Sequence, residues 1–214
     1  MPVEALFAIS PRPGLADPVM QSQTVFRTVM AALAEPGTIH ALPETLTGTI
    51  DAPAPITPAA AAILLALADY ETPIFLDEAA RNADVGAFLS FHCGSRITDS
   101  AGEASFALIA DPTSLDRLDA FAPGTLDYPD RSTTLIVQVA ELGDVSGEGS
   151  VRLRLTGPGI ADTARIGFGP VNAGLVAALA DNRARFPQGV DLIVTDGAGI
   201  LGLPRSTRIE EEGF

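Results

Sequence analysis

The groups best suited to chemistry in this sequence are arginines, hydroxyls and glycines gathered in its last third. Arg205 and Thr207 lie in one cluster near the C-terminus, and Gly157 and Gly159 flank a proline directly after a strand-like segment. A guanidinium offers paired donors to two oxygens of a phosphate or phosphonate, and a glycine turn lets backbone amides point at such an anion. These four residues are therefore predicted contacts for a tetrahedral anion.

Both clusters also have explanations that need no ligand. Two glycines around a proline are typical of a tight turn in which a glycine adopts a positive φ. An edge strand whose arginine pairs with a carboxylate accounts equally well for residues 204–207. The sequence leaves the anion site and these structural alternatives open.

Lysine is absent from all 214 residues, although thirteen arginines are present. Without an amine nucleophile, the chain cannot form an internal Schiff base with pyridoxal phosphate or with a carbonyl substrate. A P-loop, whose lysine reaches the outer phosphates of a nucleotide, is excluded for the same reason. We therefore expect no pyridoxal phosphate and no other cofactor.

The two histidines, His40 and His92, and the single cysteine, Cys93, leave little material for a metal site or a catalytic thiol. Adjacent residues in a helix do not face one another, so His92 cannot act as the base for Cys93. A histidine on an apolar helix face is more often a packed core residue than a ligand contact. His92 is accordingly a weaker candidate contact, and we predict no metal site.

Residues 197–202 match the G-x-G-x-x-G pattern of dinucleotide-binding folds and follow a predicted strand. Only twelve residues remain after this segment, and Pro204 interrupts them, so the phosphate-facing helix of that motif cannot form. A hairpin with its turn at Asp196 and Gly197 is predicted instead.

The formal net charge is −14, and the excess of acid lies in the first part of the chain. Residues 1–150 contain six arginines and twenty acidic residues, whereas residues 151–214 contain seven of each. The field of such a molecule repels nucleic acid and anionic membrane surfaces, so we expect neither as a partner. The arginines of the last third either bind a small anion or pair with carboxylates across the fold.

Three features favour a cytoplasmic protein. The first ten residues have no basic segment of the kind that begins a secretory signal. The most apolar run, residues 59–68, has half the length that a membrane span needs. One cysteine excludes an intrachain disulfide, which agrees with a reducing compartment.

The apolar spacing predicts alternating helices and strands. Thr57 and Pro58 have the residue types of a helix N-cap and first helical position. Residues 143–150 are expected to join two consecutive strands as a hairpin. Helices are predicted at residues 21–35, 57–68, 84–91 and from Pro170 to just before Phe186, and strands at residues 38–42, 72–76, 105–110, 133–142, 151–155, 190–195 and 200–209.

This pattern indicates an α/β fold with a mixed sheet flanked by helices. The chain has enough apolar residues for one good core. We therefore expect an N-terminal extension over residues 1–20 and one domain over residues 21–214.

A series of segments in this chain resembles the PhnH family, the H subunit of the bacterial carbon-phosphorus lyase machinery for phosphonate degradation. The segments run in family order and cover nearly the whole chain. They are Phe26-Arg27 leading to Glu35-Pro36-Gly37, LLALADYETPIFL at 64–76, Phe91-His92, Ala104-Ser105-Phe106, LRLTGPGI at 153–160, FPQGVDLI at 186–193 and Pro204-Arg205-Ser206-Thr207.

The resemblance implies a fold related to the large domain of pyridoxal-phosphate-dependent transferases, with that cofactor lost. It also implies a homodimer that joins the G, I and J subunits in a core complex. In that family the G, H, I and L subunits together support displacement of adenine from ATP by a phosphonate, so ATP and phosphonate would be substrates of the complex. We expect a mainly architectural subunit that lends arginines, Arg205 and Arg27 first, to the ligand site. A free-standing nucleotide hydrolase or transferase and a ligand-free dimeric scaffold are the alternatives.

Overall fold

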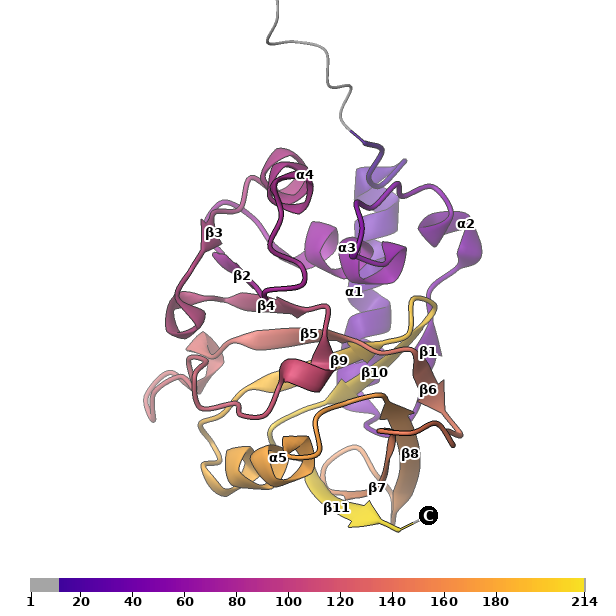
Figure 1. Ribbon diagram of the computed structural model, residues 1–214, viewed down its shortest axis with the longest axis vertical. Coiled ribbons are helices and arrows are strands. Elements are labelled where there is room, and N and C mark those ends of the chain that lie inside the picture. Colours follow the sequence, from indigo (N-terminus) through magenta and orange to yellow (C-terminus); the bar gives the residue numbers. More distant parts are fainter. Residues whose placement is uncertain (1–11, 214) are drawn as a thin grey trace, which may run out of the picture.

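The computed structural model describes residues 12–213, and its centre is a seven-stranded mixed sheet (Figure 1). Five neighbouring strands of this sheet are parallel to one another. At one edge, β10 runs antiparallel to β9, and β1 runs antiparallel to β10. In spatial order the strands are β1 (His40–Ala41), β10 (Gly199–Leu203), β9 (Asp191–Thr195), β5 (Thr134–Gln138), β4 (Phe106–Ile109), β2 (Ile74–Leu76) and β3 (Ile97–Thr98).

A second, smaller sheet is entirely antiparallel. Its spatial order is β11 (Arg208–Glu212), β7 (Val151–Thr156), β8 (Ala164–Gly169) and β6 (Glu141–Gly143). In Figure 1 it lies below the main sheet together with α5 (Leu175–Ala184), whereas α3 (Pro58–Leu67) and α4 (Ala83–Cys93) lie above the main sheet. The remaining helices are α1 (Pro18–Ala34) and the single-turn α2 (Glu44–Thr47).

The main sheet separates two apolar cores. In β5, Ile136 packs with α1, α3 and α4, whereas Leu135 and Val137 pack with α5 and the small sheet. All three side chains are fully buried. A parallel sheet covered on both faces needs apolar residues at every position rather than at alternate ones, which explains the unbroken aliphatic runs in the sequence.

Helix α3 forms as its sequence predicts. The hydroxyl of Thr57 accepts the backbone N–H of Ala60, and Pro58 occupies the first helical turn. Every residue from Ala59 to Leu64 is buried, so this helix has no solvent face in its first half. An apolar helix of this kind is stable only inside a layered core.

The α/β class and the mixed sheet are confirmed, but four local predictions are wrong. The single strand predicted at residues 133–142 is two strands, β5 in the main sheet and β6 in the small sheet, because the chain crosses from one sheet to the other at residues 139–140. Residues 143–150 do not join a hairpin, because β8 lies between β6 and β7 and pairs with both. The single strand predicted at residues 200–209 is two strands in different sheets, since Pro204 ends β10. The helix predicted to start at Pro170 begins at Leu175.

The expected N-terminal extension falls mostly outside what the structure describes. Residues 1–11 lie outside the described residues, and α1 begins at Pro18, where the side chain of Asp17 accepts the N–H of Met20. The first helix therefore includes residues 18–20, which were expected to precede the domain. Within residues 12–213, no helix has both the length and the apolar character to cross a membrane.

Candidate functional site

Three of the predicted anion contacts meet where the small sheet approaches the end of α1. Gly157 follows β7 with a φ of +138°, and a Cβ built on it would lie 3.5 Å from the Cα of Thr207. Gly159, with a φ of +81°, is so close to the helix that its Cβ would lie 2.1 Å from the carbonyl oxygen of Ala34. The glycines thus serve both a turn and a close backbone approach.

Thr207 is almost fully buried in this region, and its hydroxyl has no hydrogen-bond partner among the described residues. An unsatisfied buried hydroxyl costs free energy, so Thr207→Val is expected to raise the free energy of unfolding by about 1 kcal/mol. Chemical denaturation of both chains measures the difference.

Thr133 provides the matched control for that substitution. It is also fully buried, but its hydroxyl donates to the carbonyl of Ala104 at 2.6 Å and accepts from the N–H of Ala122. Thr133→Val should therefore lower the free energy of unfolding, by roughly 1–3 kcal/mol. Equal effects of the two substitutions would contradict the assignment of an unpaired hydroxyl to Thr207.

The side chain of Arg205 belongs to an internal hydrogen-bond network that does not include Thr207. Its guanidinium makes a bidentate ion pair with Asp191 and also donates to the hydroxyl of Ser132 and to the carbonyl of Pro129, the last at 2.5 Å. The backbone N–H of Arg205 donates to Asp191 as well, at 2.8 Å. In this arrangement Arg205 joins the loop before β5 to the start of β9, and its contact with an anion stays a prediction.

Arg27 and His92 are not part of the Gly157–Thr207 region. The side chain of Arg27 projects from the solvent-exposed side of α1, and no hydrogen bond or ion pair engages it within residues 12–213. The Nε2 atom of His92 donates to the carbonyl of Arg12 at 2.9 Å, and its ring packs against Phe88 and Phe91. His92 therefore holds the segment before α1 against α4.

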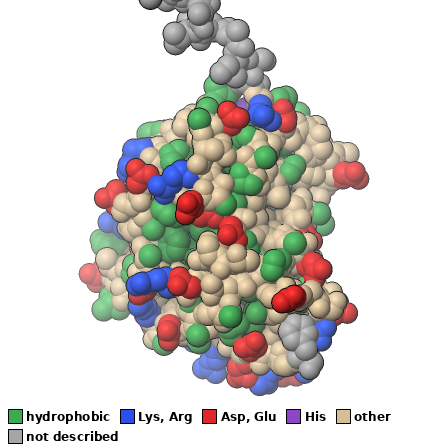
Figure 2. Space-filling view, in the orientation of Figure 1, with side chains coloured by type: hydrophobic (Ala, Val, Ile, Leu, Met, Phe, Trp, Pro, Cys, Tyr) green, Lys and Arg blue, Asp and Glu red, His purple; other side chains and the backbone are tan. Residues whose placement is uncertain are grey.

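The arginines of β7 and β8 largely pair with groups of the protein itself, which is the alternative to binding a small anion. On the outer face of the small sheet, Arg154 pairs with Glu210, and Arg165 pairs with Glu212 at 3.0 Å. Arg152 donates to the carbonyl of Val145 at 2.8 Å. Figure 2 shows arginine and acidic side chains interleaved at the lower end of the molecule, where Figure 1 places this sheet. The charges on this face of the small sheet are thus balanced largely by ion pairs across its strands.

Cys93 is shielded rather than reactive. Burial raises the pKa of its thiol to about 12. The thiolate is the nucleophile, and its population falls tenfold for each pH unit below the pKa. Because the ordinary pKa of a cysteine thiol is 9.0, the folded chain at pH 8 should react with a thiol reagent about a thousandfold more slowly than the unfolded chain. Timed labelling in buffer and in denaturant checks this, and equal rates would contradict it.

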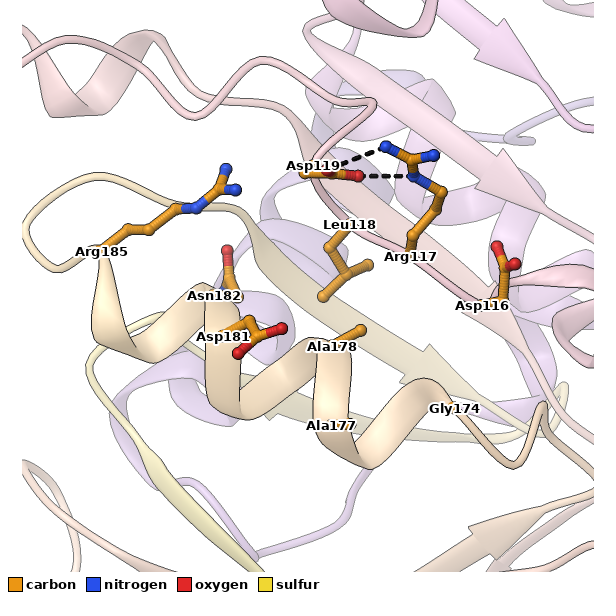
Figure 3. Close-up of a pocket in the computed structure, with 10 residues that line it drawn as sticks. All are labelled: Asp116, Arg117, Leu118, Asp119, Gly174, Ala177, Ala178, Asp181, Asn182 and Arg185. Carbon is orange, nitrogen blue, oxygen red and sulfur yellow. Dashed lines mark hydrogen bonds and ion pairs between the residues drawn. The ribbon is translucent and has the colours of Figure 1, made fainter.

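A cavity of about 330 Å³ lies between α5 and the loop that follows β4 (Figure 3). Ala177 and Ala178 of α5 lie along its floor, and charged side chains surround it. The charged lining residues are Asp116, Arg117, Asp119, Asp181 and Arg185. Three carboxylates against two guanidiniums give this cavity a net negative lining.

One of the two guanidiniums in the cavity is already engaged. Arg117 makes two hydrogen bonds to the carboxylate of Asp119, at 2.6 and 2.9 Å. This contact lowers the pKa of Asp119 and raises that of Arg117. A phosphate or phosphonate would have to displace that carboxylate to reach Arg117, which leaves Arg185 as the other guanidinium beside three carboxylates. The cavity therefore suits a ligand with both charges better than a simple anion.

The usual ligand position of an open α/β sheet is filled by the protein itself. After β2 the chain runs to β3 on one side, and after β4 it runs to β5 on the other, so the connections diverge between β2 and β4. Ligands commonly bind at such a point, beyond the carboxyl ends of the strands.

Asp77 occupies that position. Its buried carboxylate accepts the backbone N–H groups of Ala80, Ala110 and Asp111, each at 2.8 Å. Sequence reasoning missed Asp77, although an aspartate directly after an apolar strand is a recognisable signal. No group of three or more His, Cys, Asp or Glu side chains in the described part of the chain is arranged to hold a metal ion.

The fold and these sites define a layered α/β protein whose polar clusters mainly serve its own structure. Comparison with known sequences then identifies the family. Residues 13–210 match the model of the family described as "Bacterial phosphonate metabolism protein (PhnH)", and the chain belongs to this family.

Two relatives match over nearly their full lengths. One is the "Alpha-D-ribose 1-methylphosphonate 5-triphosphate synthase subunit PhnH" of Rhizobium meliloti (strain 1021), 38% identical over 197 residues that cover 92% of this chain and 94% of the relative. The other is the "Putative C-P lyase subunit protein HtxG" of Stutzerimonas stutzeri, 29% identical over 90% of this chain and 88% of the relative.

Proposed function

We propose that this chain is the H subunit of a carbon-phosphorus lyase core complex in phosphonate degradation. It supports the transfer of a phosphonate onto C1′ of the ribose of ATP, with release of adenine. The observation that carries this proposal is membership of the PhnH family from residue 13 to residue 210. The near full-length relative named as a subunit of a ribose 1-methylphosphonate 5-triphosphate synthase supports it.

The role of the subunit is mainly architectural. Arg205, the first candidate for anion binding, is tied to Asp191, and the arginines of the small sheet pair with glutamates. Arg27 is the candidate that is open to a ligand or a partner. The complex contains G, I and J subunits, and the chain forms a homodimer in the cytoplasm.

The fold is proposed to descend from the large domain of pyridoxal-phosphate-dependent transferases. The layered mixed sheet is compatible with this origin, and the absence of lysine from the sequence removes the residue that would anchor the cofactor. ATP and phosphonate are then substrates of the complex, and no cofactor belongs to this chain. An aldimine absorption band in the purified protein would contradict this.

The decisive experiment measures adenine release from ATP and methylphosphonate. We expect none from the purified chain alone and release when the G, I and L subunits are added, with omission of this chain abolishing it. Adenine release by this chain alone would instead establish the alternative, a free-standing nucleotide hydrolase or transferase. Unchanged release without this chain would leave it as a scaffold with no part in the transfer.

A further inference from the structure

The outer face of α1 is an unusually apolar surface for an exposed helix. Val25, Val29 and Ala32 of this helix point into the core, whereas four large apolar side chains point outward. These are Val19, Met20, Phe26 and Met30, with exposed fractions of 67%, 60%, 50% and 48%. We call these four residues and Arg27 the α1 outer face.

The spacing of these side chains makes one continuous stripe rather than scattered contacts. Val19, Phe26 and Met30 are separated by seven and four residues, which places them above one another on a helix with 3.6 residues per turn. Exposed methionine and phenylalanine in such a row are typical of a protein interface, where aromatic and methionine side chains are enriched. The face has the composition of a binding surface rather than of a solvated helix.

The charge of this face is opposite to that of the molecule. Arg27 is the one charged residue in α1, within a chain of net charge −14. The neighbouring acidic residues, Asp17 and Glu35, stand at the two ends of the helix, and the Asp17 side chain is engaged in capping it. Among residues 12–213, the guanidinium of the α1 outer face therefore has no carboxylate as a partner.

We infer that the α1 outer face binds a different subunit of the complex through an apolar surface that presents a carboxylate to Arg27. This inference rests on the proposed function, which supplies the partner. A second copy of the chain fits less well, because its own α1 outer face contains no acidic side chain. A buried guanidinium without a carboxylate would be costly, whereas a paired one adds specificity.

The test is co-purification with the G, I and J subunits, expressed together with this chain and captured through a tag on one of them. Phe26→Ser and Met30→Ser should each reduce the amount of this chain retained by at least about tenfold. A tenfold loss of affinity corresponds to about 1.4 kcal/mol, and truncating a central interface side chain costs at least that much. Arg27→Glu should reduce retention similarly, and Arg27→Lys should reduce it less.

Two exposed apolar residues outside α1 provide matched controls. Tyr70 and Leu126 are 76% and 73% exposed, and Tyr70→Ser and Leu126→Ser should leave retention unchanged. Thermal unfolding of every variant alone shows whether the fold survives, which we expect because the apolar side chains substituted in α1, Phe26 and Met30, are 50% and 48% exposed.

The outcomes separate this inference from the proposed function. If the unmodified chain is not retained, the proposed function itself fails. If it is retained and the α1 variants are retained equally, the inference is overturned. A change of the isolated chain from dimer to monomer in Phe26→Ser would assign the face to a second copy. Hydrogen exchange in α1 that is slow only while residues 1–11 are present would assign it to the chain's own N-terminus. Either result would overturn the inference.

Discussion

Replacing Arg205 with alanine is expected to lower the free energy of unfolding by about 3 kcal/mol, because it leaves the carboxylate of Asp191 partly buried without its partner. Arg205 and Asp191 have side-chain exposures of only 13% and 22%. The substitution also removes the hydrogen bonds that the guanidinium donates to the hydroxyl of Ser132 and to the carbonyl of Pro129. Equilibrium unfolding in urea, followed by circular dichroism, measures the loss.

An exposed ion pair of the same chemistry gives the control. Arg154 pairs with Glu210 on the outer face of the small sheet, with side-chain exposures of 42% and 64%. Arg154→Ala should therefore cost less than about 1 kcal/mol. A similar small loss in Arg205→Ala would show that the internal network contributes little.

The stability measurement also decides how a growth experiment on phosphonate is interpreted. If Arg205 contacts an anion, as its residue type predicts, Arg205→Ala should abolish growth on phosphonate while the complex still assembles. The structure adds a second route to the same phenotype, because a destabilised subunit is degraded before it assembles. Loss of growth with unchanged stability and assembly would support the anion contact.

Gly159→Ala is the second substitution with a large expected effect. A Cβ at this position would lie 2.1 Å from the carbonyl oxygen of Ala34 and 2.9 Å from the ring of Pro36, at a positive φ. The turn after β7 would have to move away from α1, at a cost of roughly 2–4 kcal/mol. Thermal and urea unfolding of the variant measure this cost.

The same glycine-to-alanine substitution at Gly86 is expected to stabilise the chain rather than destabilise it. It lies inside α4, and apart from its chain neighbours and the backbone of its own helix no atom would come within 4 Å of a Cβ at this position. Gly86→Ala should stabilise the chain by about 0.5–1 kcal/mol, since alanine is the better helix former. A stabilised Gly159→Ala chain would refute the close approach of the turn to α1.

Local signals in the sequence predicted the elements whose ends are chemically marked. Thr57 and Pro58 define the start of α3, and Asp196 with Gly197 forms the turn between β9 and β10, where the Asp196 carboxylate accepts two backbone N–H groups. These features depend on residues within a few positions of one another. The local sequence therefore contains the information that determines the start of α3 and the turn between β9 and β10.

The parts that could not be predicted depend on distant pairing. In the small sheet β8 lies between β6 and β7, so these two strands do not pair with each other. The sequence gives little sign of β8, because Gly167 and Gly169 make this segment resemble a loop. Pro170 has the residue type of a helix start, but the helix forms only from Leu175. Strand order is a property of tertiary packing that local propensity does not contain.

The same distinction applies to the site residues. The sequence identifies Arg205 as able to hold an anion, but only the fold reveals that Asp191, fourteen positions away, already occupies its guanidinium. Gly157 and Thr207 were singled out separately, and the structure brings them together. The residue type shows whether a side chain can bind an anion. Whether that side chain is free to do so depends on the partners that the fold brings to it.

The borders of the two sheets limit how this chain can associate. The outermost strands of the large sheet, β1 and β3, are two residues long, and β11 at one border of the small sheet contains three consecutive glutamates. Short outer strands expose few unpaired backbone groups, and charged side chains on an edge strand disfavour the addition of another strand, which protects against amyloid-like stacking. A protein that must assemble with others is thereby steered toward contacts made by side chains, whose geometry can distinguish one neighbour from another.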